Sequence, residues 1–357
     1  CLAPGNHDMK SPYLLHRPPA RRAITWIAGI SLLALVSGIA PGQTVCAHNA
    51  AASQDHKENE IPKPRRVTLK TKDGIQLSAF YLGGNLGKKA MPVIILHGWQ
   101  ESSESMSKLA LRIQREGHAV LVPDLRGHGK STTAVIRKAN GQTDTRQLDL
   151  DKFAKVDILR MNEDVETCKR FLMKEHNKGE CNIEKLCLIG ADMGALVALN
   201  WAVIDWNQQA TPFLKQGQDV KSLVLLSSPT SFKGVTNQLA LVQPVVRGGL
   251  NTLLLVGNGD RTSLSDTKRL YNRMERFHGT KPEDPEALKA HRLFLVELET
   301  AAQGSSLLKI KNLKPDPTEL IWIFLRNKIV NRDTLTIAGT DFMLEWKRRG
   351  NIFEEQE

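Results

Sequence analysis

The chain has 357 residues and a formal net charge of +11, and 41% of its residues are hydrophobic. That apolar content is ample for a large buried core, which excludes intrinsic disorder for the middle of the chain. Two basic runs, at residues 63–72 and 347–349, are not interleaved with aromatic residues and accompany no nucleic-acid-binding motif. We therefore interpret them as solvated surface and expect no nucleic-acid partner.

Residues 1–47 have the order of a secretory signal peptide. Three arginines precede an uncharged run over 23–40, and the small residues Val45 and Ala47 stand at the −3 and −1 positions of a cleavage site. We therefore expect an exported protein, periplasmic or extracellular. A retained membrane anchor stays open, since about 18 apolar residues just span a bilayer. Any membrane association is expected through this segment only.

Residues 48–64 are polar and unpatterned, so we assign them to a linker. The next two segments, 66–70 and 75–81, are joined at Lys72-Asp73-Gly74 and predict an antiparallel hairpin. The hairpin opens the domain that we expect over residues 65–330.

Short apolar runs fill the rest of that domain, and helical patterns lie between them. The runs fit parallel strands buried on both faces, and they are centred on residues 95, 121, 188, 225, 254 and 295. Alternating strands and helices predict an α/β fold with a doubly wound, mostly parallel sheet and right-handed crossovers. The pattern over 319–330 predicts a closing helix, and residues 331–357 form a C-terminal tail outside this core.

The pentapeptide Gly190-Ala191-Asp192-Met193-Gly194 has the form of a nucleophile elbow, G-x-S-x-G, with aspartate in place of serine. An apolar strand over 186–189 precedes it, and a small-residue apolar helix over 195–203 follows it. This is the strand–turn–helix context that the motif requires.

Three further motifs occur in a fixed order around the elbow. His97-Gly98 follows a predicted strand, the loop 124–131 reads D-L-R-G-H-G-K-S, and the loop 257–260 reads G-N-G-D. In this order and spacing, residues 64–330 resemble the α/β-hydrolase superfamily. The resemblance implies the α/β-hydrolase fold and, in most members, hydrolysis by a Ser–His–acid triad.

The resemblance also assigns positions to individual residues. Asp192 stands at the nucleophile position, Asp260 at the acid position, and Gln303 where the histidine is expected after the last strand. The backbone N–H groups of Trp99 and Met193 are implied as the oxyanion hole. Asp260 has a second interpretation, in which it caps the helix that follows.

A triad with aspartate for serine and glutamine for histidine is degenerate, because glutamine cannot cycle a proton near neutral pH. The leading hypothesis is therefore an exported pseudoenzyme that binds a small-molecule ligand or a partner through the cleft. One alternative is an active hydrolase of ester or amide bonds, whose base would have to be His97, His128 or His278. Another is an aspartate-nucleophile hydrolase that resembles haloalkane dehalogenases or epoxide hydrolases, which carry a histidine and a cap.

The segments around the site are short or unpatterned. Residues 229–250 are too few for the lid domain that many relatives insert there, so we expect the segment 132–155 to cover part of the site. Cysteine spacing shows no metal pattern, and we expect no metal and no cofactor. Pairing of Cys168 with Cys181 is left open.

Overall fold

The computed structural model describes residues 60–137, 140–209, 215–279, 282–337 and 339–350. The predicted signal segment, and most of the predicted linker, lie outside the described residues. Within the part of the chain that is described, every helix is too short or too polar to cross a lipid bilayer.

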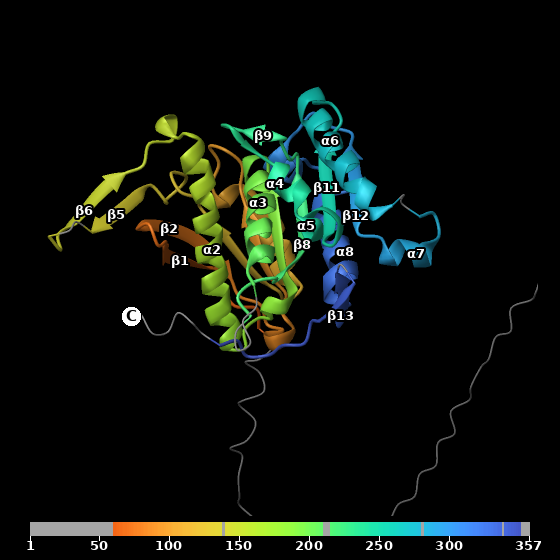
Figure 1. The fold of residues 1–357 in the computed structure, drawn as a ribbon, viewed down its shortest axis with the longest axis horizontal. Helices are drawn as coiled ribbons and strands as arrows, with labels where there is room; N and C mark the ends of the chain where they lie inside the picture. Colours follow the sequence, from red (N-terminus) through yellow and green to blue (C-terminus); the bar gives the residue numbers. More distant parts are fainter. Residues whose placement is uncertain (1–59, 138–139, 210–214, 280–281, 338, 351–357) are drawn as a thin grey trace, which may run out of the picture. The chain divides into compact units, whose positions relative to one another are not determined.

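A ten-stranded mixed sheet forms the centre of the domain (Figure 1). Its order is β12 (Leu293–Leu298), β11 (Asn251–Gly257), β8 (Val220–Leu226), β7 (Leu186–Ala191), β3 (Pro92–Leu96), β4 (Ala119–Pro123), β2 (Ile75–Leu82), β5 (Thr133–Arg137) and β6 (Thr143–Gln147), with β1 (Arg65–Lys70) also paired to β2. The strands from β12 to β4 are parallel. β1, β2, β5 and β6 are antiparallel additions at one end. The predicted hairpin and the predicted parallel strands are confirmed.

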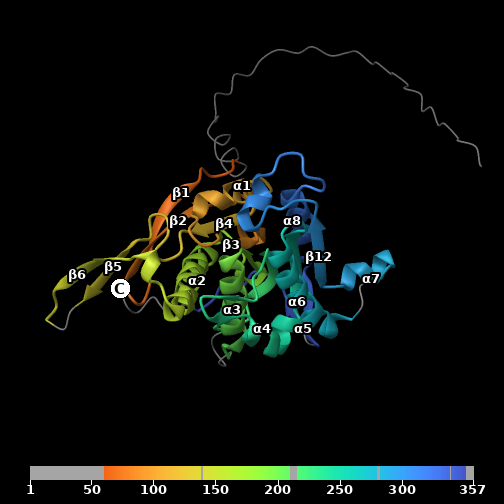
Figure 2. The same cartoon turned by 90° about the horizontal axis from the view of Figure 1, so that it is seen from above.

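Helices cover both faces of the sheet, so the doubly wound prediction is also confirmed (Figure 2). One face packs α1 (Ser107–Arg115) and α8 (Pro317–Leu325), and the other packs α2 (Lys155–Asn177), α3 (Met193–Asn207) and α6 (Arg261–His278). The shorter helices are α4 (Gln238–Val242), α5 (Pro244–Gly248) and α7 (Pro285–Ala290). Single 3₁₀ turns lie at Gly87–Lys89, Ser103–Met106, Leu150–Lys152, Ile183–Lys185 and Gly304–Lys309, and α8 continues as a π-helical turn over Arg326–Val330.

The hydrophobic pattern of each helix explains its place. α3 is apolar on nearly every side and is buried along its length, because it packs on the sheet and is flanked by α2, α4 and α5. α2 shows one apolar stripe, and its members Met161, Val165, Cys168 and Leu172 are all buried against the sheet. The opposite face of α2 is solvated.

Most of the segment expected to cover part of the site lies away from it. Residues 133–137 and 143–147 pair as the strands β5 and β6, which extend the sheet beyond β2. Only the end of the segment reaches the site, where the Phe153 ring lies 6.1 Å from the Trp99 ring. The expected absence of a full lid fits the short hairpin of β9 (Ser231–Phe232) and β10 (Val235–Thr236), which precedes α4.

The segment set apart from the core as a tail packs against the domain over its described part. It forms the hairpin of β13 (Thr334–Ile337) and β14 (Thr340–Met343). Phe342 packs edge-on to Trp206 at 5.4 Å, and Trp346 lies 5.1 Å from the His176 ring. The buried Arg349 side chain forms ion pairs with Glu184 and Asp219.

Three cysteines of the described residues are free and buried: Cys168, Cys181 and Cys187. Cys168 and Cys181 do not pair, and the Cys181 thiol instead lies 3.6 Å from the Leu172 carbonyl oxygen. Burial raises the pKa of all three thiols. They are therefore packing residues in the folded state.

Candidate functional site

Asp192 occupies a sharp turn between β7 and α3. Its φ of 51° and ψ of −121° form a backbone conformation that costs a residue with a side chain about 1–3 kcal/mol. The turn depends on two glycines at which the backbone closes tightly. A Cβ on Gly190 would lie 2.4 Å from the Gly194 carbonyl oxygen, and a Cβ on Gly194 would lie 2.4 Å from that of His97. The geometry of a nucleophile elbow is therefore present with a carboxyl at its tip.

Burial raises the pKa of the Asp192 carboxyl, and the charge of Glu101 raises it further. The neighbouring backbone N–H of Met193 acts in the opposite direction and lowers the pKa, because its dipole favours the carboxylate. This N–H is the donor that the resemblance assigns to the oxyanion hole. The Asp192 side chain thus lies against the group that would otherwise receive a reacting oxygen.

Glu101 is a site residue that sequence reasoning missed. Its Oε2 accepts hydrogen bonds from the Gly98 N–H at 2.9 Å and the Ser105 hydroxyl at 3.2 Å, while its Oε1 accepts one from the Ser305 hydroxyl. These donors fix the carboxylate between the loop after β3 and the loop after β12. The only sequence signal was an acid four positions after His97, in the same turn.

The loop after β12 reaches the elbow, as the resemblance implies for the histidine loop. A Cβ on Gly304 would lie 3.3 Å from the Cβ of Asp192, and the Gly304 N–H donates to the Ser227 hydroxyl at 3.0 Å. Gln303 is the preceding residue and is exposed. Its assignment to the histidine position stays a prediction.

Asp260 caps α6, which was the second interpretation of this residue. Its Oδ2 accepts the Ser263 N–H at 2.8 Å, and hydrogen bonds from Ser263 lower the pKa of the carboxyl. The Asp260 loop lies beside the loop after β12, since the Gly259 N–H donates to the Thr300 carbonyl at 2.9 Å. Among the described residues, no hydrogen bond or ion pair joins Asp260 to Asp192 or Gln303.

His97 is buried and fully engaged in holding two loops together. Its Nε2 accepts the Leu125 N–H at 3.0 Å, so Nδ1 carries the proton and donates to the Gly98 carbonyl at 2.7 Å. Burial lowers the pKa of His97 to about 4, with His128 as a further cause. The ring is therefore neutral at physiological pH and has no nitrogen left for Asp192.

The other two histidines considered as bases are engaged elsewhere. His128 donates from Nδ1 to the Arg126 carbonyl at 3.0 Å, and His278 donates from Nε2 to the Arg247 carbonyl at 3.0 Å. Within the described ranges, no histidine makes a hydrogen bond to Asp192, and Glu101 is the one charged neighbour that shifts its pKa. The elbow thus brings two carboxyl groups near each other, and in the described chain neither is hydrogen-bonded to a histidine.

Trp99, at the second position of the predicted oxyanion hole, has its indole in an aromatic cluster. The centres of the His128, Phe153 and Phe232 rings lie 4.9, 6.1 and 5.2 Å from its own. The Lys233 ammonium lies 4.4 Å from the indole centre and donates to the Phe153 carbonyl at 3.0 Å. This cluster forms an apolar wall next to the His97 loop.

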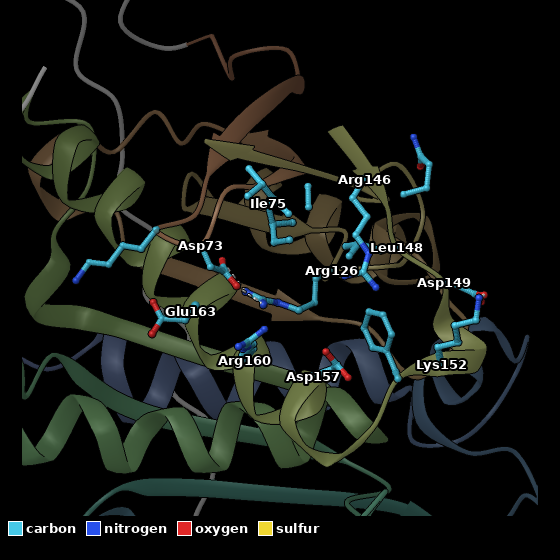
Figure 3. Close-up of a pocket in the computed structure, with 15 residues that line it drawn as sticks. Asp73, Ile75, Arg126, Arg146, Leu148, Asp149, Lys152, Asp157, Arg160 and Glu163 are labelled. Carbon is cyan, nitrogen blue, oxygen red and sulfur yellow. Dashed lines mark hydrogen bonds and ion pairs between the residues drawn. The ribbon is translucent and has the colours of Figure 1, made fainter. Parts of the chain in front are cut away.

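A cavity of about 620 Å³ lies between the β5–β6 hairpin and α2 (Figure 3). Arg126 lies at its floor, where it binds Asp73 and the buried Asp164, each at 2.7 Å. Burial raises the pKa of Asp164 to about 6. Phe153 lines this cavity and also contacts Trp99, so the cavity is a neighbour of the elbow site and not part of it. In the described chain, no group of three His, Cys, Asp or Glu side chains is arranged to hold a metal.

Comparisons with known proteins agree with this geometry. A family model described as serine aminopeptidase, S33, matches residues 87–276, just over half of the chain. None of the curated proteins matches significantly. Among solved structures, the chain is similar to an esterase of Pyrococcus furiosus, with 17% identity and a TM-score of 0.52 over 75% of this chain and 91% of that one. It is also similar to an acylaminoacyl peptidase of Pyrococcus horikoshii, with 14% identity and a TM-score of 0.52 over 78% of this chain and 43% of that one. At these identities the structural likeness shows the fold alone.

Proposed function

We propose that this chain, which belongs to the serine aminopeptidase S33 family of α/β-hydrolases, is a non-catalytic member of that family. It would bind a ligand or partner through the former active-site cleft. One observation carries the proposal. A carboxyl, that of Asp192, stands at the tip of the elbow in the strained turn conformation, beside the backbone N–H of Met193 that lowers its pKa. An acyl group therefore meets no hydroxyl nucleophile, and a carboxyl lies beside the implied oxyanion donor.

The absence of a base supports the same conclusion. A carboxylate that attacks carbon forms an ester with the enzyme, and a base must then activate water to release it. The haloalkane dehalogenases and epoxide hydrolases use a histidine for that step. Here the buried His97 is neutral and fully hydrogen-bonded, and an exposed glutamine, Gln303, precedes the glycine next to Asp192.

The charge of the cleft favours a cationic ligand. Glu101 is held in place by three donors, and its charge acts on Asp192. An ammonium group between the two carboxyls relieves their repulsion, whereas a carboxylate adds to it. We therefore expect alkylamines to raise the melting temperature of the protein and alkylcarboxylates to leave it unchanged at this site, with the response to amines lost in Glu101→Gln.

A second candidate function is hydrolysis with Asp192 as the nucleophile. The observation in its favour is the backbone strain at Asp192, because strained conformations persist mainly at functional sites. In that case the attack would give a covalent ester on Asp192, and water would have to release the product.

The two candidates are separated by a screen of activated esters and aminoacyl anilides on the purified chain, beside Asp192→Ala. We expect both proteins to match the buffer rate, since loss of one triad member alone lowers turnover by about 10⁴–10⁶. Robust turnover that disappears in Asp192→Ala would overturn the non-catalytic proposal and establish Asp192 as a nucleophile.

We also propose that the chain is exported and cleaved after Ala47. The support is the order of arginines, apolar run and small residues in the sequence. Mass spectrometry of the exported protein should find an N-terminus between His48 and Ala51. Recovery of the intact apolar run in the membrane fraction would instead assign it as an anchor.

A further inference from the structure

A second cavity, of about 530 Å³, lies beside the edge strand β12 and shares no lining residue with the elbow site. It opens to solvent and is lined by residues of β12, α7 and α8 and of the π-helical turn that follows α8. Its walls are mainly apolar and include Leu253, Leu288, Phe294, Val296, Ile323 and Phe324. A cavity of this size and character suits a small molecule with an apolar body.

The charged residues that line this cavity are all cations: Lys289, Lys328 and Arg332. Lys289 is paired with Glu286 at 2.7 Å, so the lining cations without a carboxylate partner in the described chain are Lys328 and Arg332. Lys328 is buried, and its ammonium donates to the carbonyls of Leu288 at 3.1 Å, Lys289 at 2.8 Å and His291 at 2.7 Å. These three bonds use every N–H of the ammonium but bring no negative charge to it. No carboxylate of the described chain lies within ion-pair distance of Lys328.

Arg332 is half-buried and also lacks a carboxylate partner among the described residues. Its Nε donates to the Asn327 carbonyl at 3.3 Å and its Nη2 to the Lys289 carbonyl at 3.1 Å. Nη1 has no acceptor in the described chain, so one edge of the guanidinium is available to a ligand.

The cations affect one another. Burial lowers the pKa of Lys328, and together with the nearby charges of Arg332 and Arg292 it brings that pKa to about 8. Such a cluster is stabilised by an anion, and a carboxylate is the anion that matches the planar edge of a guanidinium. The apolar walls and the cationic lining are separate observations, and a ligand with an apolar body and a carboxylate complements both.

We propose that this cavity binds an amphipathic carboxylate, a medium-chain fatty acid, whose alkyl chain lies along Phe294, Leu288 and Ile323 and whose carboxylate binds Arg332. The site is distinct from the elbow cleft and does not depend on the function proposed there. Alkyl alcohols fit the walls but not the cations, and alkylammonium ions are repelled by them. Fatty acids of increasing length should bind more tightly by about fourfold per methylene until the cavity is filled.

The test is calorimetric titration of the full chain with decanoate, octanoate, decanol and decyltrimethylammonium, each below its micelle concentration. Decanoate should bind at least tenfold more tightly than decanol and octanoate, and decyltrimethylammonium should not bind. Arg332→Gln should weaken decanoate about tenfold and leave decanol unchanged. Ile323→Glu should abolish decanoate binding, because it places an acid at a position that is already 43% exposed.

Matched controls lie at the opposite end of the sheet and on another helix. Arg146→Gln on β6 and Leu159→Glu on α2, where Leu159 is 40% exposed, make the same chemical changes away from the cavity. Both should bind decanoate as the parent does, and circular dichroism should show all four variants folded. Equal binding of decanoate and decanol, or unchanged decanoate binding in Arg332→Gln, would overturn the proposal. The proposal would also be overturned if the parent did not bind decanoate and Ile323→Glu changed the protein from a dimer to a monomer. The cavity would then be the contact surface for a second copy of the chain.

Discussion

Arg349 binds the buried carboxylate of Asp219 across 130 positions of sequence. The same guanidinium donates from Nε to Glu184 at 2.9 Å. On its other side, Asp219 lies 2.8 Å from the ammonium of Lys169, which also binds Asp205 at 2.6 Å. This network fastens the C-terminal segment to the start of β8.

Arg349→Ala should lower the free energy of unfolding by about 1.5–3 kcal/mol, because it removes a charged hydrogen-bond donor from Asp219 and Glu184, although Asp219 keeps its ion pair with Lys169. Urea denaturation monitored by circular dichroism measures the effect. The neighbouring Arg348 is exposed, so Arg348→Ala should change stability by less than about 0.5 kcal/mol. Equal effects of the two substitutions would contradict the buried role of Arg349.

Asp192→Asn should stabilise the folded protein at pH 7. Burial raises the pKa of Asp192 in the folded state, so the stability it contributes is present at low pH and is lost as pH rises through that pKa. Asparagine does not ionise, so Asp192→Asn should raise the free energy of unfolding by about 1 kcal/mol at pH 7, as substitutions of other destabilising active-site groups do. The gain should shrink as the pH falls. Asp151→Asn, at an exposed aspartate, is the control, and a gain that grows on acidification would refute the assignment.

His97 should make the protein sensitive to acid. Its folded pKa of about 4 lies below the ordinary value of 6.5, so its contribution is complete above pH 6.5 and is lost as the pH falls toward 4. The full loss is about 3 kcal/mol, at 1.36 kcal/mol per pKa unit. His97→Gln should be less stable at pH 7.5 but should lose less stability between pH 6.5 and 4. Parallel pH curves for the two proteins would show that His97 is not the group that titrates.

Repair of the triad tests the position of Gln303. Asp192→Ser with Gln303→His should react with a fluorophosphonate probe, whereas either change alone should not, because the serine needs the base and the base needs a nucleophile. Labelling is read by mass spectrometry at residue 192. Equal labelling of Asp192→Ser alone would show that another residue serves as base and that Gln303 is wrongly assigned.

The fold could be predicted because strands and turns are marked by residues that are neighbours in the sequence. Apolar runs between glycine-rich turns mark β3, β4, β7, β8 and β11, each of which is buried on both faces. The β5–β6 hairpin gave no such signal. Every side chain of β6 is exposed at the edge of the sheet, so its sequence carries no alternation of polar and apolar residues.

The site was only partly predictable for the same reason. Gly190 and Gly194 allow close backbone contacts within and next to the turn, so the elbow can be recognised from a short sequence motif. The role of Glu101 depends on Ser305, which comes from a loop 204 positions away, and that of Arg349 depends on Asp219 and Glu184, which are 130 and 165 positions away. Such partners are set by the packing of loops, which no single-sequence pattern records.

The three buried thiols make unfolding of the domain hard to reverse in an oxidising environment. In the folded state, Cys168, Cys181 and Cys187 are screened from oxidants, and their raised pKa values suppress the reactive thiolate. Once they are exposed together, any two of these three thiols that oxidise to a disulfide leave the third one over. That thiol is left to cross-link with another molecule, so a copy that unfolds is removed from the refolding population.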